Sequence, residues 1–183
     1  FFIRLQGCPV GCPWCDTKHT WYLEEANNIT IDKMLAKTDK PDPTFSLMNP
    51  KEILEALLTI KGSDKIRHIV ITGGEPCLYD LNELVDKLIV NGFMVQVETS
   101  GTHQIKAKGS WITLSPKYNM QGGLNVREDV YSLADEIKMP VGKNKDVENL
   151  LSILDKCYTS RVYLQPLSQS EKATKYCIDV ATK

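Results

Sequence analysis

The sequence predicts an α/β fold, a partial TIM-like (β/α)6 barrel. Short apolar runs rich in β-branched residues alternate with amphipathic helical patterns, which is typical of parallel strands joined by right-handed crossover helices. Polar and glycine-rich residues directly follow several of these runs, as they do at the mouth of a barrel. A complete eight-stranded barrel usually takes about 250 residues. This chain has 183 residues, so we expect about six strands.

Six segments have the character of strands, because they are short, apolar and bounded by turn residues. They are Phe1–Leu5, His68–Thr72, Phe93–Thr99, Trp111–Ser115, Asp135–Met139 and Arg161–Gln165. The polar residues that follow strands are Gly73–Glu75, Thr99–Gly101, Ser115–Lys117 and Gln165–Pro166. A doubly wound sheet fits the same alternation, but polar groups at the ends of so many strands favour a barrel mouth.

Four helices are predicted from their start signals. Asn49 and Glu52 form a capping box around Pro50, and Asp80 and Glu83 repeat the box before the next apolar stripe. Asn144 begins a third helical pattern, and the segment Ser168–Glu171 opens a fourth.

Composition indicates one globular domain over residues 1–183, with an insertion around residues 24–48 where no period is strong. The chain is 42% hydrophobic and 25% charged, which disfavours a disordered chain. Its 22 basic and 23 acidic residues give a net charge of −1, so no nucleic-acid partner is expected. No uncharged stretch is long enough for a membrane helix. The chain opens inside a strand without an initiator Met, and we expect a fragment of a cytoplasmic protein.

Three of the six cysteines crowd into one short loop directly after the first strand. Cys8, Cys12 and Cys15 have the spacing C-x3-C-x2-C, and the glycine and proline turns between them allow all three sulfurs to face one compact metal centre. An iron–sulfur cubane normally takes four cysteines, so three leave one iron open to another ligand. A structural zinc site completed by His19 is the alternative, although zinc modules usually present two separated ligand pairs.

This cysteine loop after the first strand of a βα barrel resembles that of the radical S-adenosylmethionine (SAM) enzymes. Further motifs narrow the resemblance to the 7-carboxy-7-deazaguanine synthase family. They are Phe2–Cys8, Cys15–Thr17, Thr72–Pro76, Glu98–Thr102, Ser115–Lys117 and Leu164–Pro166. The resemblance implies a 4Fe-4S cluster on the three cysteines, SAM on the open iron, and Mg2+. It also implies an electron donor such as flavodoxin, and a homodimer.

The implied reaction is conversion of 6-carboxy-5,6,7,8-tetrahydropterin to 7-carboxy-7-deazaguanine with loss of ammonia, a step of queuosine biosynthesis. The resemblance assigns one group of residues to the cofactor: Trp14, Cys15, Asp16, Gly74, Glu75, Glu98, Ser115, Pro116, Lys117 and Gln165. It assigns Arg4 and Thr72 to the substrate and Thr17 to Mg2+. Glu98 is expected near the reacting centre, and Trp14 could equally be an apolar cover over the cluster.

The residue types suit these roles. A carboxylate such as Glu75 accepts hydrogen bonds from an ammonium, and a planar guanidinium such as that of Arg4 suits a carboxylate. The family also has a Gln-Gly-Glu-Gly segment before the first strand and a His- and Pro-containing tail, and neither is in this sequence, so we expect an incomplete pterin site. A radical SAM activase that installs a glycyl radical on a protein is a second alternative, but it would not need Arg4 and Thr17.

Overall fold

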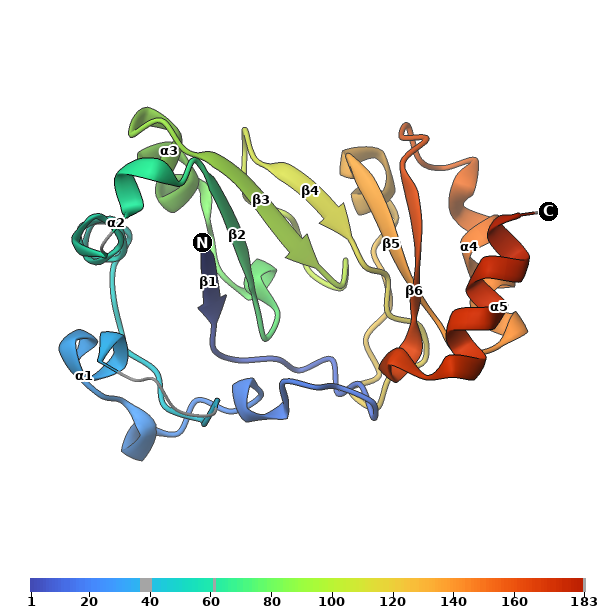
Figure 1. The fold of residues 1–183 in the computed structure, drawn as a ribbon, viewed down its shortest axis with the longest axis horizontal. Helices are drawn as coiled ribbons and strands as arrows, with labels where there is room; N and C mark the ends of the chain where they lie inside the picture. Colours follow the sequence, from blue (N-terminus) through green and yellow to red (C-terminus); the bar gives the residue numbers. More distant parts are fainter. Residues whose placement is uncertain (37–40, 61, 183) are drawn as a thin grey trace. The chain divides into compact units, whose positions relative to one another are not determined.

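The computed structural model describes residues 1–36, 41–60 and 62–182. It contains six parallel strands that are hydrogen-bonded in chain order in one open sheet (Figure 1). The strands are β1 (Phe2–Leu5), β2 (His68–Gly73), β3 (Met94–Thr99), β4 (Trp111–Leu114), β5 (Glu136–Val141) and β6 (Val162–Pro166). Each predicted strand is found to within two residues at either end. The predicted fold class, a parallel α/β sheet of six strands that does not close, is therefore confirmed.

The α-helices are α1 (Ile31–Leu35), α2 (Pro50–Thr59), α3 (Asn82–Val90), α4 (Asn144–Leu154) and α5 (Glu171–Ala181). The capping box before α2 is confirmed: Asn49 Oδ1 accepts from the Glu52 amide at 3.0 Å, and Glu52 accepts from the Asn49 amide at 2.7 Å. None of the helices in the described part of the chain is long and apolar enough to cross a membrane.

The predicted capping box before α3 is wrong. The helix begins at Asn82, and its N-cap residue is Leu81, which makes no side-chain capping bond. Asp80 Oδ1 accepts from the Asn82 amide, at 3.1 Å. Leu81 explains the shift, because its side chain is buried and its amide donates to the Lys106 carbonyl at 2.8 Å. This tertiary contact holds Leu81 just ahead of the first turn.

The chain divides into two compact units. The first comprises residues 1–9, 17–97 and 106–110, and the second residues 10–16, 98–105 and 111–183. The first contains β1, β2, most of β3, and helices α1 to α3. The second contains β4 to β6, α4 and α5. The single domain expected from composition stays a prediction.

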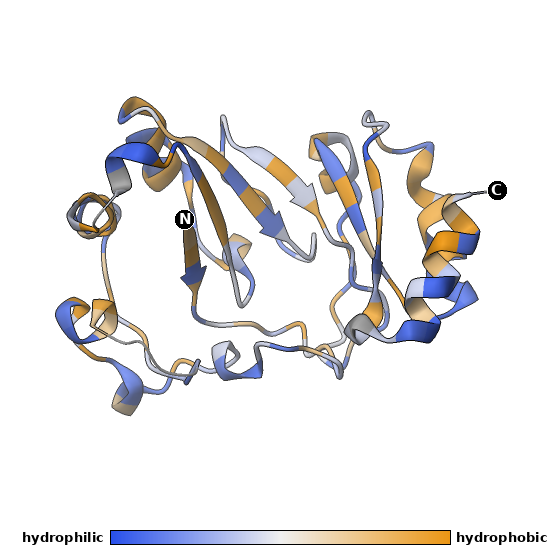
Figure 2. Ribbon diagram, viewed as in Figure 1, coloured by the Kyte–Doolittle hydropathy of each residue, from blue (hydrophilic) through white to orange (hydrophobic). Residues whose placement is uncertain are grey.

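The second unit has a continuous apolar core. Alternate residues of β5 point to opposite faces, so Ile137, Met139 and Val141 are buried while Glu136 and Lys138 are half-buried on the other face. Figure 2 shows this alternation along β5. Helix α4 packs against β5 and α5 packs against β6. Cys177 lies in this cluster as a small buried core residue.

The proposed insertion at 24–48 contains a short 3-10 helix, Glu25–Asn27, and α1. Asn28 and Phe45 form an isolated parallel bridge that joins the two ends of the segment. Phe45 is buried, so this end of the segment is anchored in the first unit. Residues 37–40 of the segment lie outside the described residues.

Candidate active site

In the first unit, the ends of β1 and β2 approach each other so closely that glycine is required between them. The Gly74 amide donates to the Leu5 carbonyl at 3.0 Å, and the Glu75 amide donates to the Gly7 carbonyl at 2.8 Å. A Cβ on Gly74 would lie 2.0 Å from the Gly7 oxygen. The lack of a side chain at Gly74 therefore admits the backbone that leads into the cysteine loop, and the assignment of Gly74 to the cofactor stays a prediction.

Glu75 follows this contact and is almost fully buried, with 1% of its surface exposed. Its Oε1 accepts from the Cys77 amide at 3.0 Å, which caps the short 3-10 helix Pro76–Leu78. Tyr79, just beyond this helix, donates from its hydroxyl to the Gln6 carbonyl at 2.6 Å. Tyr79 was not among the predicted site residues, and this bond ties the segment after β2 to the residue before Gly7.

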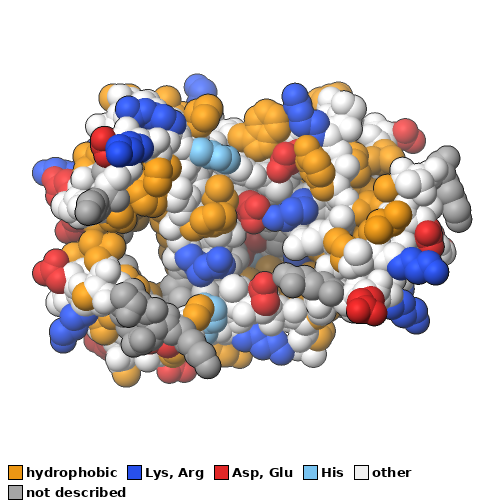
Figure 3. All heavy atoms as spheres, viewed as in Figure 1, with side chains coloured by type: hydrophobic (Ala, Val, Ile, Leu, Met, Phe, Trp, Pro, Cys, Tyr) orange, Lys and Arg blue, Asp and Glu red, His pale blue; other side chains and the backbone are white. Residues whose placement is uncertain are grey.

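Arg4 and Thr72, both predicted to bind substrate, are register partners on β1 and β2. The Arg4 side chain is exposed and its Nη1 donates to the Gly73 carbonyl at 3.4 Å. Arg4 also lines a cavity of about 640 Å3 beside β1, whose walls include apolar residues of α1 and α2. Figure 3 shows an opening on this side of the first unit with apolar side chains around it.

Thr17, the predicted magnesium ligand, lies in the first unit before the 3-10 helix Lys18–Thr20. Its carbonyl accepts from the Thr20 amide at 2.9 Å and from Thr20 Oγ1 at 2.8 Å. Its side chain makes no capping bond to that helix and is half-buried. The Thr17 carbonyl therefore has a structural role in this turn, whereas the Thr17 hydroxyl does not cap the helix.

In the second unit, two predicted cofactor segments meet. Lys117 Nζ donates to the Ser115 carbonyl at 2.7 Å and lies 2.6 Å from Ser115 Oγ, and it stands over the Trp14 ring at 5.6 Å from the centroid. Ser115 and Pro116 are buried, and Asp16 is exposed beyond Trp14. The structure thus brings together three of the residues that the family resemblance assigns to SAM, namely Trp14, Ser115 and Lys117.

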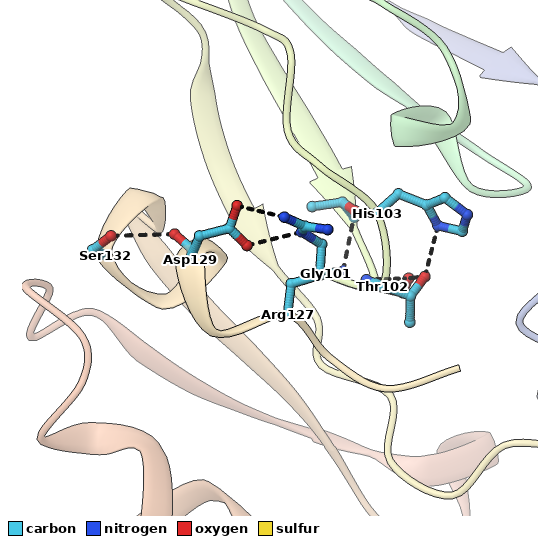
Figure 4. Close-up of polar contacts among 8 residues, drawn as sticks. Gly101, Thr102, His103, Arg127, Asp129 and Ser132 are labelled. Carbon is cyan, nitrogen blue, oxygen red and sulfur yellow. Dashed lines mark hydrogen bonds and ion pairs between the residues drawn. The ribbon is translucent and has the colours of Figure 1, made fainter. Parts of the chain in front are cut away.

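The loop after β3 is held by its own hydroxyl groups. Thr99 Oγ1 accepts from the Gly101 amide at 3.1 Å, and the Ser100 and Thr102 hydroxyls are 2.8 Å apart. Thr102 Oγ1 is in turn 2.9 Å from His103 Nδ1, so His103 has a partner that the sequence did not indicate. Figure 4 shows this loop beside Arg127, whose amide donates to the Gly101 carbonyl at 2.9 Å.

Glu98 on β3 forms an ion pair that sequence reasoning missed. Lys138 Nζ on β5 lies 2.7 Å from Glu98 Oε1, and both side chains are about a quarter exposed, at 28% and 27%. The sequence signal that could have drawn attention to Lys138 is the alternation of charged and apolar residues along β5, which places Lys138 on the face opposite the core. Gln165 lies on β6, which is the neighbour of β5, and unlike the ion pair it is exposed.

The cysteine loop spans both units, with Cys8 in the first and Cys12 and Cys15 in the second. None of the three is in a disulfide, and the Cys15 amide donates to the Cys12 carbonyl at 3.0 Å. Over residues 1–36, 41–60 and 62–182, no three His, Cys, Asp or Glu side chains are gathered closely enough to hold a metal ion. The donors themselves are three thiols, the ligands that iron–sulfur clusters take.

Comparison with known proteins identifies the family. A model of the Radical SAM superfamily matches residues 2–162. The 7-carboxy-7-deazaguanine synthase of Escherichia coli strain K12 is 46% identical over 184 residues, which cover 97% of this chain and 80% of that protein. The chain belongs to the 7-carboxy-7-deazaguanine synthase family of radical SAM enzymes.

Two further comparisons agree. The 7-carboxy-7-deazaguanine synthase of Buchnera aphidicola is 45% identical over 181 residues, which cover 97% of this chain and 80% of the Buchnera protein. The crystal structure of QueE from Escherichia coli superposes with a TM-score of 0.88 at 44% identity, covering 99% of this chain and 80% of that one.

The family implies a 4Fe-4S cluster and SAM, together with a small-molecule substrate and a reductant. The residues present fit the cluster, because C-x3-C-x2-C supplies three sulfur ligands that are not consumed in disulfides. Family membership also disfavours the zinc module with His19.

Proposed function

We propose that this chain converts 6-carboxy-5,6,7,8-tetrahydropterin to 7-carboxy-7-deazaguanine with release of ammonia. The observation that carries the proposal is 46% identity over 97% of the chain to a synthase of that name. When bound, the cluster supplies the electron that opens the carbon–sulfur bond of SAM. The tasks of binding and orienting SAM and the pterin then fall to the chain's own side chains.

Arg4 and Thr72 are proposed to bind the substrate carboxylate. They are adjacent across β1 and β2, where a guanidinium and a hydroxyl can donate to the same anion. Glu75, buried behind the Gly7 contact, is proposed to accept from the SAM ammonium. Lys117 and Ser115 are proposed to bind SAM from the end of β4, with Trp14, Asp16, Gly74, Pro116 and Gln165 completing the cofactor site.

The direct test is incubation of anaerobically reconstituted protein with SAM, a reductant and the carboxypterin, followed by mass analysis of the products. We expect the deazapurine together with ammonia. Formation of 5'-deoxyadenosine without the deazapurine would favour the glycyl radical activase. Protein that took up zinc but no iron or sulfide would restore the zinc module.

Mg2+ is proposed to bind Thr17 and the substrate carboxylate, as a hard cation that orients the substrate. We expect Thr17→Ala to lower turnover roughly ten- to a hundredfold, the usual cost of disturbing a metal site. SAM affinity should stay unchanged, because the ion does not contact the sulfonium. Turnover is measured with and without a chelator, and SAM binding by dialysis. Wild-type turnover that survives chelation would refute the magnesium role.

Lys138 is proposed to hold the Glu98 carboxylate in place on the side of β5 away from the core. We expect Lys138→Met to lower kcat/KM about tenfold, the effect of losing about 1.4 kcal/mol of transition-state stabilisation. Lys138→Arg should retain most activity, because it keeps the charge next to Glu98. The matched control is Lys145→Met, which breaks an exposed ion pair with Glu148 on α4 and should change nothing. Equal kinetics for both Met variants would contradict the role of Lys138.

We propose that an electron donor such as flavodoxin reduces the cluster. We also propose that the chain forms a homodimer. Both rest on the family resemblance alone. Light scattering on the purified chain and reduction of the cluster by purified flavodoxin test them separately.

A further inference from the structure

The loop between β4 and β5 contacts the cysteine loop at several points. From this geometry we infer that residues 117–123, here called the clamp loop, position the Val10–Cys15 part of the cysteine loop against the SAM-binding run Ser115–Lys117. The inference rests on the proposed function only for the identity of SAM as the cofactor. All residues involved lie in the second compact unit.

Two consecutive amides of the clamp loop bond two consecutive carbonyls of the cysteine loop. The Gly122 amide donates to the Val10 carbonyl at 3.0 Å, and the Gln121 amide donates to the Gly11 carbonyl at 3.3 Å. The Val10 side chain is only 2% exposed, so this stretch is packed in the protein. A buried carbonyl that lost its partner would be left unsatisfied, which makes the pairing a strong constraint.

Gly11 permits this contact because it has no side chain. Its φ of +69° lies in the left-handed region, and a Cβ there would sit 3.0 Å from the Gly122 nitrogen and 3.3 Å from the Gln121 Cβ. Gly11 directly precedes Cys12. Any displacement of the clamp loop from Gly11 would therefore also shift the next residue, Cys12, which is a proposed cluster ligand.

The start of the clamp loop contacts the same stretch of the cysteine loop from another point. Lys117 Nζ stands over the Trp14 ring at 5.6 Å while donating to the Ser115 carbonyl at 2.7 Å. A cation over an aromatic face is attracted to the ring. Contacts at Val10, Gly11 and Trp14 thus bracket Cys12 on both sides in sequence.

A hydrogen bond to the core anchors the clamp loop. The Tyr118 hydroxyl lies 3.1 Å from the Tyr131 hydroxyl, and Tyr131 is 3% exposed in the apolar core of the second unit. Burial, with the neighbouring phenol, raises the pKa of Tyr118 well above its usual value. The phenol is therefore neutral at physiological pH, and either hydroxyl can donate this hydrogen bond.

The test compares two glycines that have the same backbone conformation but different surroundings. Gly11→Ala adds a methyl group against the clamp loop, whereas Gly92→Ala, at φ +83° and outside the clamp loop, has nothing within 4 Å of the added Cβ. Both carry the same left-handed backbone strain, so only the contact differs. The reconstituted proteins are compared by iron content, SAM dissociation constant, and the change that SAM causes in the electron paramagnetic resonance spectrum of the reduced cluster.

We expect Gly11→Ala to weaken SAM binding about tenfold or more and to alter the SAM-dependent spectrum, while Gly92→Ala stays within about twofold of wild type. Iron loss confined to Gly11→Ala would also support the clamp. Identical behaviour of the two variants, whether both normal or both impaired, would overturn it.

If Gly11→Ala does not fold, Tyr118→Phe decides the matter, because it removes only the hydroxyl that bonds Tyr131. We expect a weaker SAM affinity and an altered spectrum with the cluster retained, and wild-type values would overturn the clamp. The proposed function fails separately: a chain that binds SAM and shows the clamp effect but makes no deazapurine would refute the substrate and leave the clamp standing.

Discussion

Cys15→Ala should leave the chain without its cluster. A site built from three thiolates that loses one retains too few ligands for a cubane. We expect iron to fall from about four atoms per chain to well under one, and SAM cleavage to disappear with it. Iron and sulfide are measured after anaerobic reconstitution, and 5'-deoxyadenosine is measured by chromatography. Cys8→Ala and Cys12→Ala should behave in the same way.

The matched control is Cys157→Ala, which removes a thiol that packs against the core of the second unit. Burial raises the pKa of Cys157, so this group stays a protonated thiol at neutral pH and is a poor metal ligand. We expect wild-type iron content. Iron retained in Cys15→Ala, or lost equally in Cys157→Ala, would show that the C-x3-C-x2-C loop does not hold the cluster.

The strands could be predicted from sequence because their signal is local. Runs such as His68–Thr72 are apolar, β-branched and bounded by glycine, and a strand buried on both faces requires little else. Helix α2 was equally predictable, since Asn49, Pro50 and Glu52 specify its start within four residues. The start of α3 was not, because Leu81 is held by Lys106, 25 residues further along the chain.

The site was only partly predictable for the same reason. The position of polar residues after apolar runs located the strand ends, whereas the roles of Arg4 and Thr72 come from the family resemblance; the structure shows that these two residues are register partners. Lys138 was missed because its pairing with Glu98 joins strands 40 residues apart. Whether two charged side chains on β3 and β5 meet depends on the register of the sheet, which residue types do not specify.

Gly74→Ala should disrupt the first unit where β1 and β2 lead into the site. The new Cβ would lie 2.0 Å from the Gly7 oxygen and 2.7 Å from the Gly7 carbonyl carbon. Both are backbone atoms, so no rotamer change relieves the clash and the two segments must separate. Separation would break the bond from the Glu75 amide to the Gly7 carbonyl, which is 2.8 Å long.

We expect Gly74→Ala to lower stability by about 1–3 kcal/mol, the usual cost of overpacking, and to weaken SAM binding at least about tenfold. Thermal unfolding and equilibrium dialysis measure the two effects. The control is Gly92→Ala, at φ +83° with nothing within 4 Å of the added Cβ, which introduces backbone strain without a clash. It should lose some stability but bind SAM normally, because Gly92 follows α3 and lies outside the predicted cofactor residues. SAM binding that was unchanged in Gly74→Ala would mean that the approach of Gly74 to Gly7 serves the sheet alone, and Glu75 would then lose its proposed place beside the cofactor.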